Sequence, residues 1–208
     1  MLFFIHADFN IGLCGGYSRH GLQTQKTSAR PFHKVTDYKN GGQFKIFFNY
    51  QRNMVNNLDL KVEAFGGAIF GDVQQNNKTV VQPSFVGGIV AKGELDFDEE
   101  RSFYLLAGLQ VSSLKISNFT FKDPAIDTTT EDFKLPHGIY DSFFITPIIG
   151  IGGSIYLNKR VSLIGEITHS GYFFGHNIPI NNDSKRIYFT NLRVSVGINI
   201  KLPQTSNS

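Results

Sequence analysis

The stretch Ile187–Leu202, IYFTNLRVSVGINIKL, alternates between apolar and polar residues over most of its length. One side of the alternation carries Leu192, Val194, Val196, Ile198 and Ile200. The positions between them carry Asn191, Arg193, Ser195, Gly197 and Asn199. Because successive side chains of a β-strand point to opposite faces, this period of two predicts a strand with one apolar and one polar face.

The same alternation occurs in eight segments along the chain. They are 8–19, 42–52, 58–70, 84–97, 102–114, 142–157, 161–173 and 187–202. The links between them alternate strictly in length, with short links at 53–57, 98–101 and 158–160 and long ones at 20–41, 71–83, 115–141 and 175–186. In an up-and-down meander this places all short turns at one end and all long loops at the other. The pattern predicts an all-β, eight-stranded, antiparallel up-and-down transmembrane β-barrel.

One proline interrupts this regularity. Pro147 lies within segment 142–157, on its apolar side. Proline cannot donate a hydrogen bond to a neighbouring strand, so we expect a bulge or a local break at this position.

Bulk composition excludes several other classes of protein. The 208 residues are 41% hydrophobic and 18% charged, and no apolar run approaches the roughly 18 residues of a membrane helix. A formal charge of +3 gives no reason to expect nucleic acid as a partner. Cys14 is the single cysteine, which rules out an internal disulfide and a cysteine-based metal site.

The polar face of the segments carries charges of both signs in mid-strand. They are Lys45, Lys61, Glu63, Lys92, Glu94, Glu166 and Arg193. An eight-stranded barrel is only wide enough for its own side chains, so these groups should pair with one another inside the lumen. A lipocalin-type barrel with an apolar lumen and a soluble sandwich are the alternatives. The chain has no Trp, whereas lipocalins carry one at the base of the lumen.

Eight alternating strands, a charged lumen and links sorted by length resemble the small outer-membrane barrels of the OmpA, OmpX and opacity-protein type. The last segment is similar to the C-terminal β-signal of that family, through Ser195, Gly197, Ile200 and Leu202. The family usually ends on Phe or Trp, whereas this chain has Leu202 followed by the tail 203–208. The resemblance implies a bacterial outer-membrane location. It implies as partners the membrane lipids, lipopolysaccharide and the barrel assembly machinery.

Residues 1–7 precede the first alternating segment. They combine an apolar patch with a small residue, Ala7, and so look like the end of a signal peptide. The alternative is a first strand that begins at Met1. We therefore expect a leader remnant at 1–7, the barrel at 8–202 and a short tail at 203–208.

Catalytic and cofactor chemistry is not expected. His169 and Ser170 are adjacent, so alternation sends them to opposite faces, unlike the His-x-Ser arrangement of outer-membrane lipid hydrolases. His6, His20, His33, His137 and His176 are predicted to be solvated, and their spacing does not suit a metal.

Function is therefore expected at the loop end. The first long link is basic through Lys26, Arg30, Lys34 and Lys39, which favours a polyanion or a host-surface molecule as its ligand. We expect a monomer with a closed lumen that serves envelope structure and surface interaction. The alternatives are a small pore for passive transport and, second, a lipid-modifying hydrolase.

Overall fold

The computed structural model describes residues 7–25, 33–34, 39–55, 58–75, 78–117, 119–122, 130–133, 139–171, 176–180 and 183–203. Within these ranges the fold consists of strands, eight of them long. The long strands are β1 (Ala7–Gln25), β3 (Lys39–Val55), β4 (Leu58–Phe70), β6 (Lys78–Asp96), β7 (Arg101–Ser117), β10 (Ile139–Tyr156), β11 (Val161–Ser170) and β13 (Asp183–Lys201). In the described part of the chain, no helix is long and apolar enough to cross a membrane.

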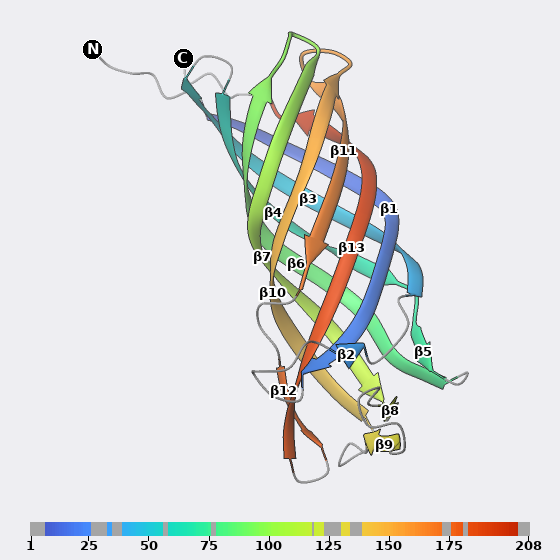
Figure 1. Ribbon diagram of the computed structural model, residues 1–208. Helices are drawn as coiled ribbons and strands as arrows, with labels where there is room; N and C mark the ends of the chain where they lie inside the picture. Colours follow the sequence, from blue (N-terminus) through green and yellow to red (C-terminus); the bar gives the residue numbers. More distant parts are fainter. Residues whose placement is uncertain are drawn as a thin grey trace.

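The eight long strands form one closed barrel. Each pairs antiparallel with the next long strand in the sequence, and β13 returns to pair with β1 from Asn10↔Lys201 to Gln25↔Arg186. Figure 1 shows the strands winding steeply around a common axis. The predicted fold class is confirmed, and the strands extend further than the alternation indicated, with β6 beginning at Lys78 rather than at residue 84.

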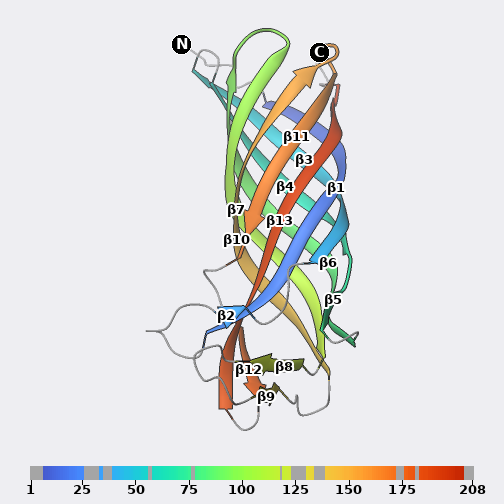
Figure 2. The same ribbon diagram turned by 45° about the vertical axis from the view of Figure 1, so that its right-hand side comes forward.

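The two ends of the barrel differ as the link lengths predicted. The turns at 97–100 and 157–160 lie at the end where β1 starts and β13 finishes, at the top of Figure 1. Five short strands lie at the opposite end, which Figure 2 shows from a second direction. They are β2 (His33–Lys34), β5 (Val73–Gln75), β8 (Phe119–Lys122), β9 (Thr130–Phe133) and β12 (His176–Ile180).

The two faces of the barrel wall carry opposite chemistry. Outward-facing side chains are large, apolar and exposed, from Phe103 at 37% to Val196 at 70%. Inward-facing side chains are buried, and most of them are polar or charged. A continuous apolar exterior around a polar interior is stable only when lipid surrounds the barrel. This excludes the lipocalin-type barrel and the soluble sandwich.

The prediction of a bulge or break at Pro147 is wrong. Strand β10 pairs with β7 without any register shift, and Pro147 lies opposite Leu109. The carbonyl oxygen of Pro147 accepts a bond from Gly171 N, on the β11 side, just beyond the end of that strand. Since the N and O of a strand residue point to the same side, the nitrogen of Pro147 also points to the β11 side, and the ladder to β7 does not depend on its missing N–H. Register shifts occur elsewhere among the described strands: between Pro83 and Phe85, between Asn53 and Val55, and between Val73 and Gln74.

Two glycines make room for rings inside the barrel. A Cβ on Gly12 would lie 2.2 Å from Cζ of Phe47, and one on Gly152 would lie 2.5 Å from the ring of Tyr104. Any other residue would collide with a ring that has no free space to move into. These two glycines therefore leave room for the bulky lumen residues opposite them.

Candidate functional site

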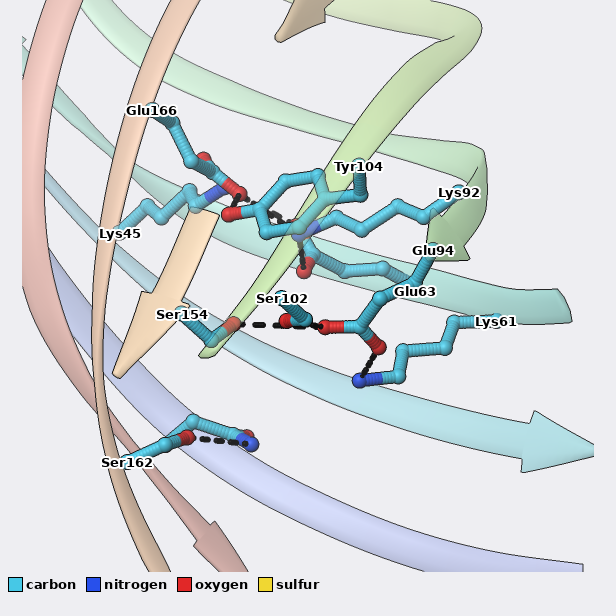
Figure 3. Close-up of polar contacts among 11 residues, drawn as sticks. Lys45, Lys61, Glu63, Lys92, Glu94, Ser102, Tyr104, Ser154, Ser162 and Glu166 are labelled. Atoms are coloured by element: carbon cyan, nitrogen blue, oxygen red, sulfur yellow. Dashed lines mark hydrogen bonds and ion pairs between the residues drawn. The ribbon is translucent and has the colours of Figure 1, made fainter. Parts of the chain in front are cut away.

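Four charged side chains form a closed ring across the middle of the lumen. Lys45 comes from β3, Glu63 from β4, Lys92 from β6 and Glu166 from β11. Lys45 Nζ lies 2.9 Å from Glu63 Oε1 and 2.6 Å from Glu166 Oε2. Lys92 Nζ lies 2.6 Å from Glu63 Oε2 and 2.6 Å from Glu166 Oε1. Each amino group therefore bridges both carboxylates, and the four charges sum to zero (Figure 3).

Burying these four charges carries a large desolvation cost. The side chains of both glutamates are at most 1% exposed, so their charges are almost entirely removed from water. Such a site is tolerated only when every charge is paired and hydrogen-bonded. Tyr104 OH donates to Glu166 Oε1 at 3.0 Å, and Lys92 Nζ lies 4.7 Å from the Tyr104 ring centroid. The hydroxyl and the ring face both stabilise the charges that they meet.

A second polar layer lies towards the short-turn end of the barrel. Lys61 forms an ion pair with Glu94, and both side chains are buried. Ser102 donates a hydrogen bond to the same carboxylate, and Ser154 does so at 3.4 Å (Figure 3). The sequence prediction omitted Tyr104, Ser102 and Ser154 from the network. Alternation places all three on the polar face, so the signal was present in the sequence.

Arg193 lies in the lumen as predicted but does not join the ring. Its Nε donates to Thr168 Oγ1 at 3.1 Å, and the residue is 3% exposed. Within the described residues Arg193 makes no ion pair, and its Nη2 has no hydrogen-bond partner. The seven predicted charges thus divide into a ring of four, a separate pair and one arginine held by a hydroxyl.

The free space in the lumen is interrupted at the ring. A polar cavity of about 220 Å³ lies at the short-turn end, lined by Asn10, Asp59 and Asp96 among others. Beside Lys45 and Glu166 the remaining space is about 10 Å³. A water molecule requires at least roughly 10–15 Å³, so this cavity holds about one water molecule.

The lumen beyond the ring is filled by large side chains, and one of them corrects a prediction. Phe144, Phe189 and Leu114 are each at most 1% exposed. His20, predicted to be solvated, is 0% exposed, with Nε2 2.6 Å from the Gly71 oxygen and its ring 5.9 Å from that of Phe189. The prediction was wrong because β1 continues to Gln25 and carries this residue inward.

The remaining predicted residues are the basic residues of the first long link and those of the β-signal-like strand. Lys26 and Arg30 lie outside the described residues, and Lys34 and Lys39 lie on β2 and β3. In the β-signal-like strand, Ser195 is buried whereas Ile200 and Leu202 are 44% and 41% exposed. A Cβ on Gly197 would lie 2.7 Å from the Cys14 sulfur, so this glycine faces inward.

Two further predictions concern chemistry and the leader. Ser170 is buried and His169 is half-exposed, which places them on opposite faces as expected. Within the described ranges, no three His, Cys, Asp or Glu residues are grouped closely enough to hold a metal ion. Ala7, the expected last residue of the leader, is the first residue of β1, and residues 1–6 lie outside the described part.

Comparison with known proteins adds the fold family. No family model and no curated protein matches the sequence. Among solved structures, Neisserial surface protein A matches 95% of this chain and 99% of its own length, at 14% identity and a TM-score of 0.52. The chain has the fold of a small outer-membrane β-barrel. Its apolar belt and its charged lumen agree with that fold.

Two further solved structures are similar to this chain at lower TM-scores. The attachment invasion locus protein Ail of Yersinia pestis matches 92% of this chain and 98% of its own length, at 11% identity and a TM-score of 0.45. The outer membrane protease OmpT of Escherichia coli matches 94% of this chain and 97% of its own length, at 11% identity and a TM-score of 0.45. Because a fold does not determine an activity, the activity of this protein has to be argued from its own residues.

Proposed function

We propose that this outer-membrane barrel is a non-conducting, non-enzymatic monomer that anchors its long loops at the cell surface. In this role it serves envelope structure and surface interaction. The observation that carries the proposal is the neutral ring of Lys45, Glu63, Lys92 and Glu166.

A pore requires a continuous aqueous path, and the ring opposes one. Its members come from four different strands, so each strand is tied to the lumen contents as well as to its neighbours. Opening a path would separate buried charges in a medium of low dielectric constant, which costs several kcal/mol per charge. The barrel wall therefore supports the loops rigidly, and rigid walls with variable loops are typical of surface-binding proteins.

Conductance in planar lipid bilayers tests the proposal. The purified barrel should give almost no channel events, whereas a Lys45→Ala/Glu166→Ala variant should conduct because the ring is broken without a change in net charge. Ile46→Ala/Ile167→Ala is the matched control, since these residues are next along the same two strands and face outward. If the unmodified barrel conducts as readily as the ring variant, it is a pore and the proposal fails.

The first long loop supports a second, more specific proposal. Lys26, Arg30, Lys34 and Lys39 would bind polyanions such as the phosphates of lipopolysaccharide. Replacing all four with Ser should weaken binding to lipopolysaccharide at low salt. The difference should disappear at about 1 M salt, where the screening length falls to roughly 3 Å. Equal binding by both proteins at low salt would show that this loop is not the site.

A further inference from the structure

The lipid-facing wall of the barrel is hollowed by an apolar groove of about 880 Å³. It lies near the short-turn end, where β7, β10, β11 and β13 are consecutive in the sheet (Figures 1 and 2). The register explains it, because Phe103, Gly153, Gly165 and Val196 are successive neighbours across the four strands. The two adjacent outward positions Gly153 and Gly165 thus lack side chains, and they lie between the aromatic ring of Phe103 and the side chain of Val196.

Apolar side chains form the sides of the groove, and no side chain fills the space above its glycines. Ile155, Leu163 and Ile198 line it towards the short-turn end. A Cβ on Gly165 would have no heavy atom within 4 Å, so the space above this glycine is free. The volume falls within the roughly 300–1,000 Å³ of small-molecule sites.

One basic residue lines the groove, and a run of acidic residues immediately precedes it in the chain. Arg101 is exposed, is the one charged residue lining the groove among the described residues, and makes no side-chain hydrogen bond or ion pair there. The turn immediately before it is Asp98-Glu99-Glu100, and all three residues are exposed. The basic residues of the other short turn, Lys159 and Arg160, line the polar cavity at the lumen mouth instead.

We propose that this groove is a binding site for a zwitterionic phospholipid with a primary ammonium head group, of the ethanolamine type. One acyl chain lies over Gly153 and Gly165. The phosphate is bound by Arg101, because a guanidinium matches phosphate oxygens with two parallel hydrogen bonds. The ammonium lies against the carboxylates of Glu99 and Glu100.

The head group, rather than the chain, provides the selectivity. Bulk lipid is as apolar as the groove, so filling it with an acyl chain gives packing but no preference among lipids. A net anionic head group would meet three carboxylates beside one guanidinium. A quaternary ammonium cannot donate hydrogen bonds to those carboxylates. Only a phosphate joined to a primary ammonium matches both signs of charge and also donates hydrogen bonds to the carboxylates.

Brominated lipids can test this directly, because the chain has no Trp and a single introduced Trp gives an unambiguous fluorescence signal. Phe103→Trp places the reporter in the groove, and Tyr50→Trp places it on the opposite part of the wall. The two native side chains are 37% and 38% exposed, so the reporters are matched for access to lipid. Each barrel is reconstituted in phosphatidylcholine vesicles with brominated phosphatidylethanolamine, phosphatidylglycerol or phosphatidylcholine as the quencher.

The preference for the ethanolamine lipid, measured by quenching, should be about fivefold greater at the Phe103 reporter than at the Tyr50 reporter. About fivefold is the factor that one basic residue contributes near a membrane surface. Arg101→Gln should remove this preference, and so should Gly165→Leu, which fills the groove. Gly93→Leu is the matched control, because Gly93 also faces lipid with open space around it but lies on β6. Glu99→Gln/Glu100→Gln should shift the preference towards phosphatidylglycerol, a change that a purely structural role would not produce.

Two results would overturn the proposal. One is an equal preference for the ethanolamine lipid at both reporters, which would make the groove ordinary annular surface. The other is quenching at the Phe103 reporter that falls as the protein-to-lipid ratio rises, which would show that a second copy of the barrel covers the groove.

Discussion

Replacing Glu166 with glutamine removes one negative charge from a site where two ammonium groups are buried. Each oxygen of Glu166 lies 2.6 Å from a lysine Nζ, one from Lys45 and one from Lys92. The amide of glutamine keeps the shape but offers one acceptor and one donor. One lysine therefore faces an N–H group, and the ring changes from neutral to a net charge of +1.

The expected loss of stability is large. Removing one partner of a buried ion pair costs about 3–5 kcal/mol, because the remaining charge stays buried without compensation. The measurement is the free energy of unfolding in urea, followed by the shift in gel migration that separates folded from unfolded barrel. Adding Lys92→Met to Glu166→Gln leaves Lys45 paired with Glu63 and should recover stability relative to the single variant.

Lys201→Met provides the control. Lys201 pairs with Asp8 at the rim, where the lysine side chain is 42% exposed, and such pairs contribute about 0–1 kcal/mol. The reasoning is refuted if Glu166→Gln costs no more than Lys201→Met. In that case water would reach the ring, and the lumen could not be a dry seal.

Three further predictions concern the barrel wall and its lining. Gly12→Val places a side chain where the aromatic ring of Phe47 lies, and should lower the free energy of unfolding by about 1–3 kcal/mol or prevent assembly. Failed assembly would be seen on a gel as loss of the band of folded barrel, which changes its migration on heating. Val194→Arg on the lipid face should cost about 2–4 kcal/mol of unfolding free energy, whereas Leu202→Arg at the rim should cost about 0–1 kcal/mol; equal costs would contradict a membrane-embedded belt. Pro147→Ala should change the free energy of unfolding by no more than about 0.5–1.5 kcal/mol, because the restored N–H points to Gly171 and can gain a single hydrogen bond there; a larger loss of stability would contradict this.

Much of this architecture is present in the sequence as a period of two. Alternation assigns every lumen charge to the correct face, since that assignment needs only the strand geometry. The alternating link lengths locate the two ends of the barrel. Tyr104 could also have been placed in the network, because it lies on the polar face of its segment.

Other features depend on three-dimensional geometry that no local pattern contains. Lys45 meets Glu166 across the lumen, 121 positions away, and this pairing depends on the tilt and stagger of all the strands. The burial of His20 depends on how far β1 and β13 continue beyond the clear alternation. The groove at Gly165 depends on the register of four strands, whereas each glycine alone indicates only a missing side chain.

The seam between β1 and β13 also has a kinetic consequence. The strand nearest the start of the chain receives its second partner from the strand nearest the end, so the closing contacts span almost the whole described sequence. A topology with such a high contact order folds slowly, and until closure the open edge of β1 can pair with other chains. During that interval Lys45 and Lys92 also lack the carboxylate of Glu166 as a partner, because β11 is among the last strands to be synthesised. Biogenesis therefore requires that the β1 edge be shielded from the time it emerges until β13 arrives.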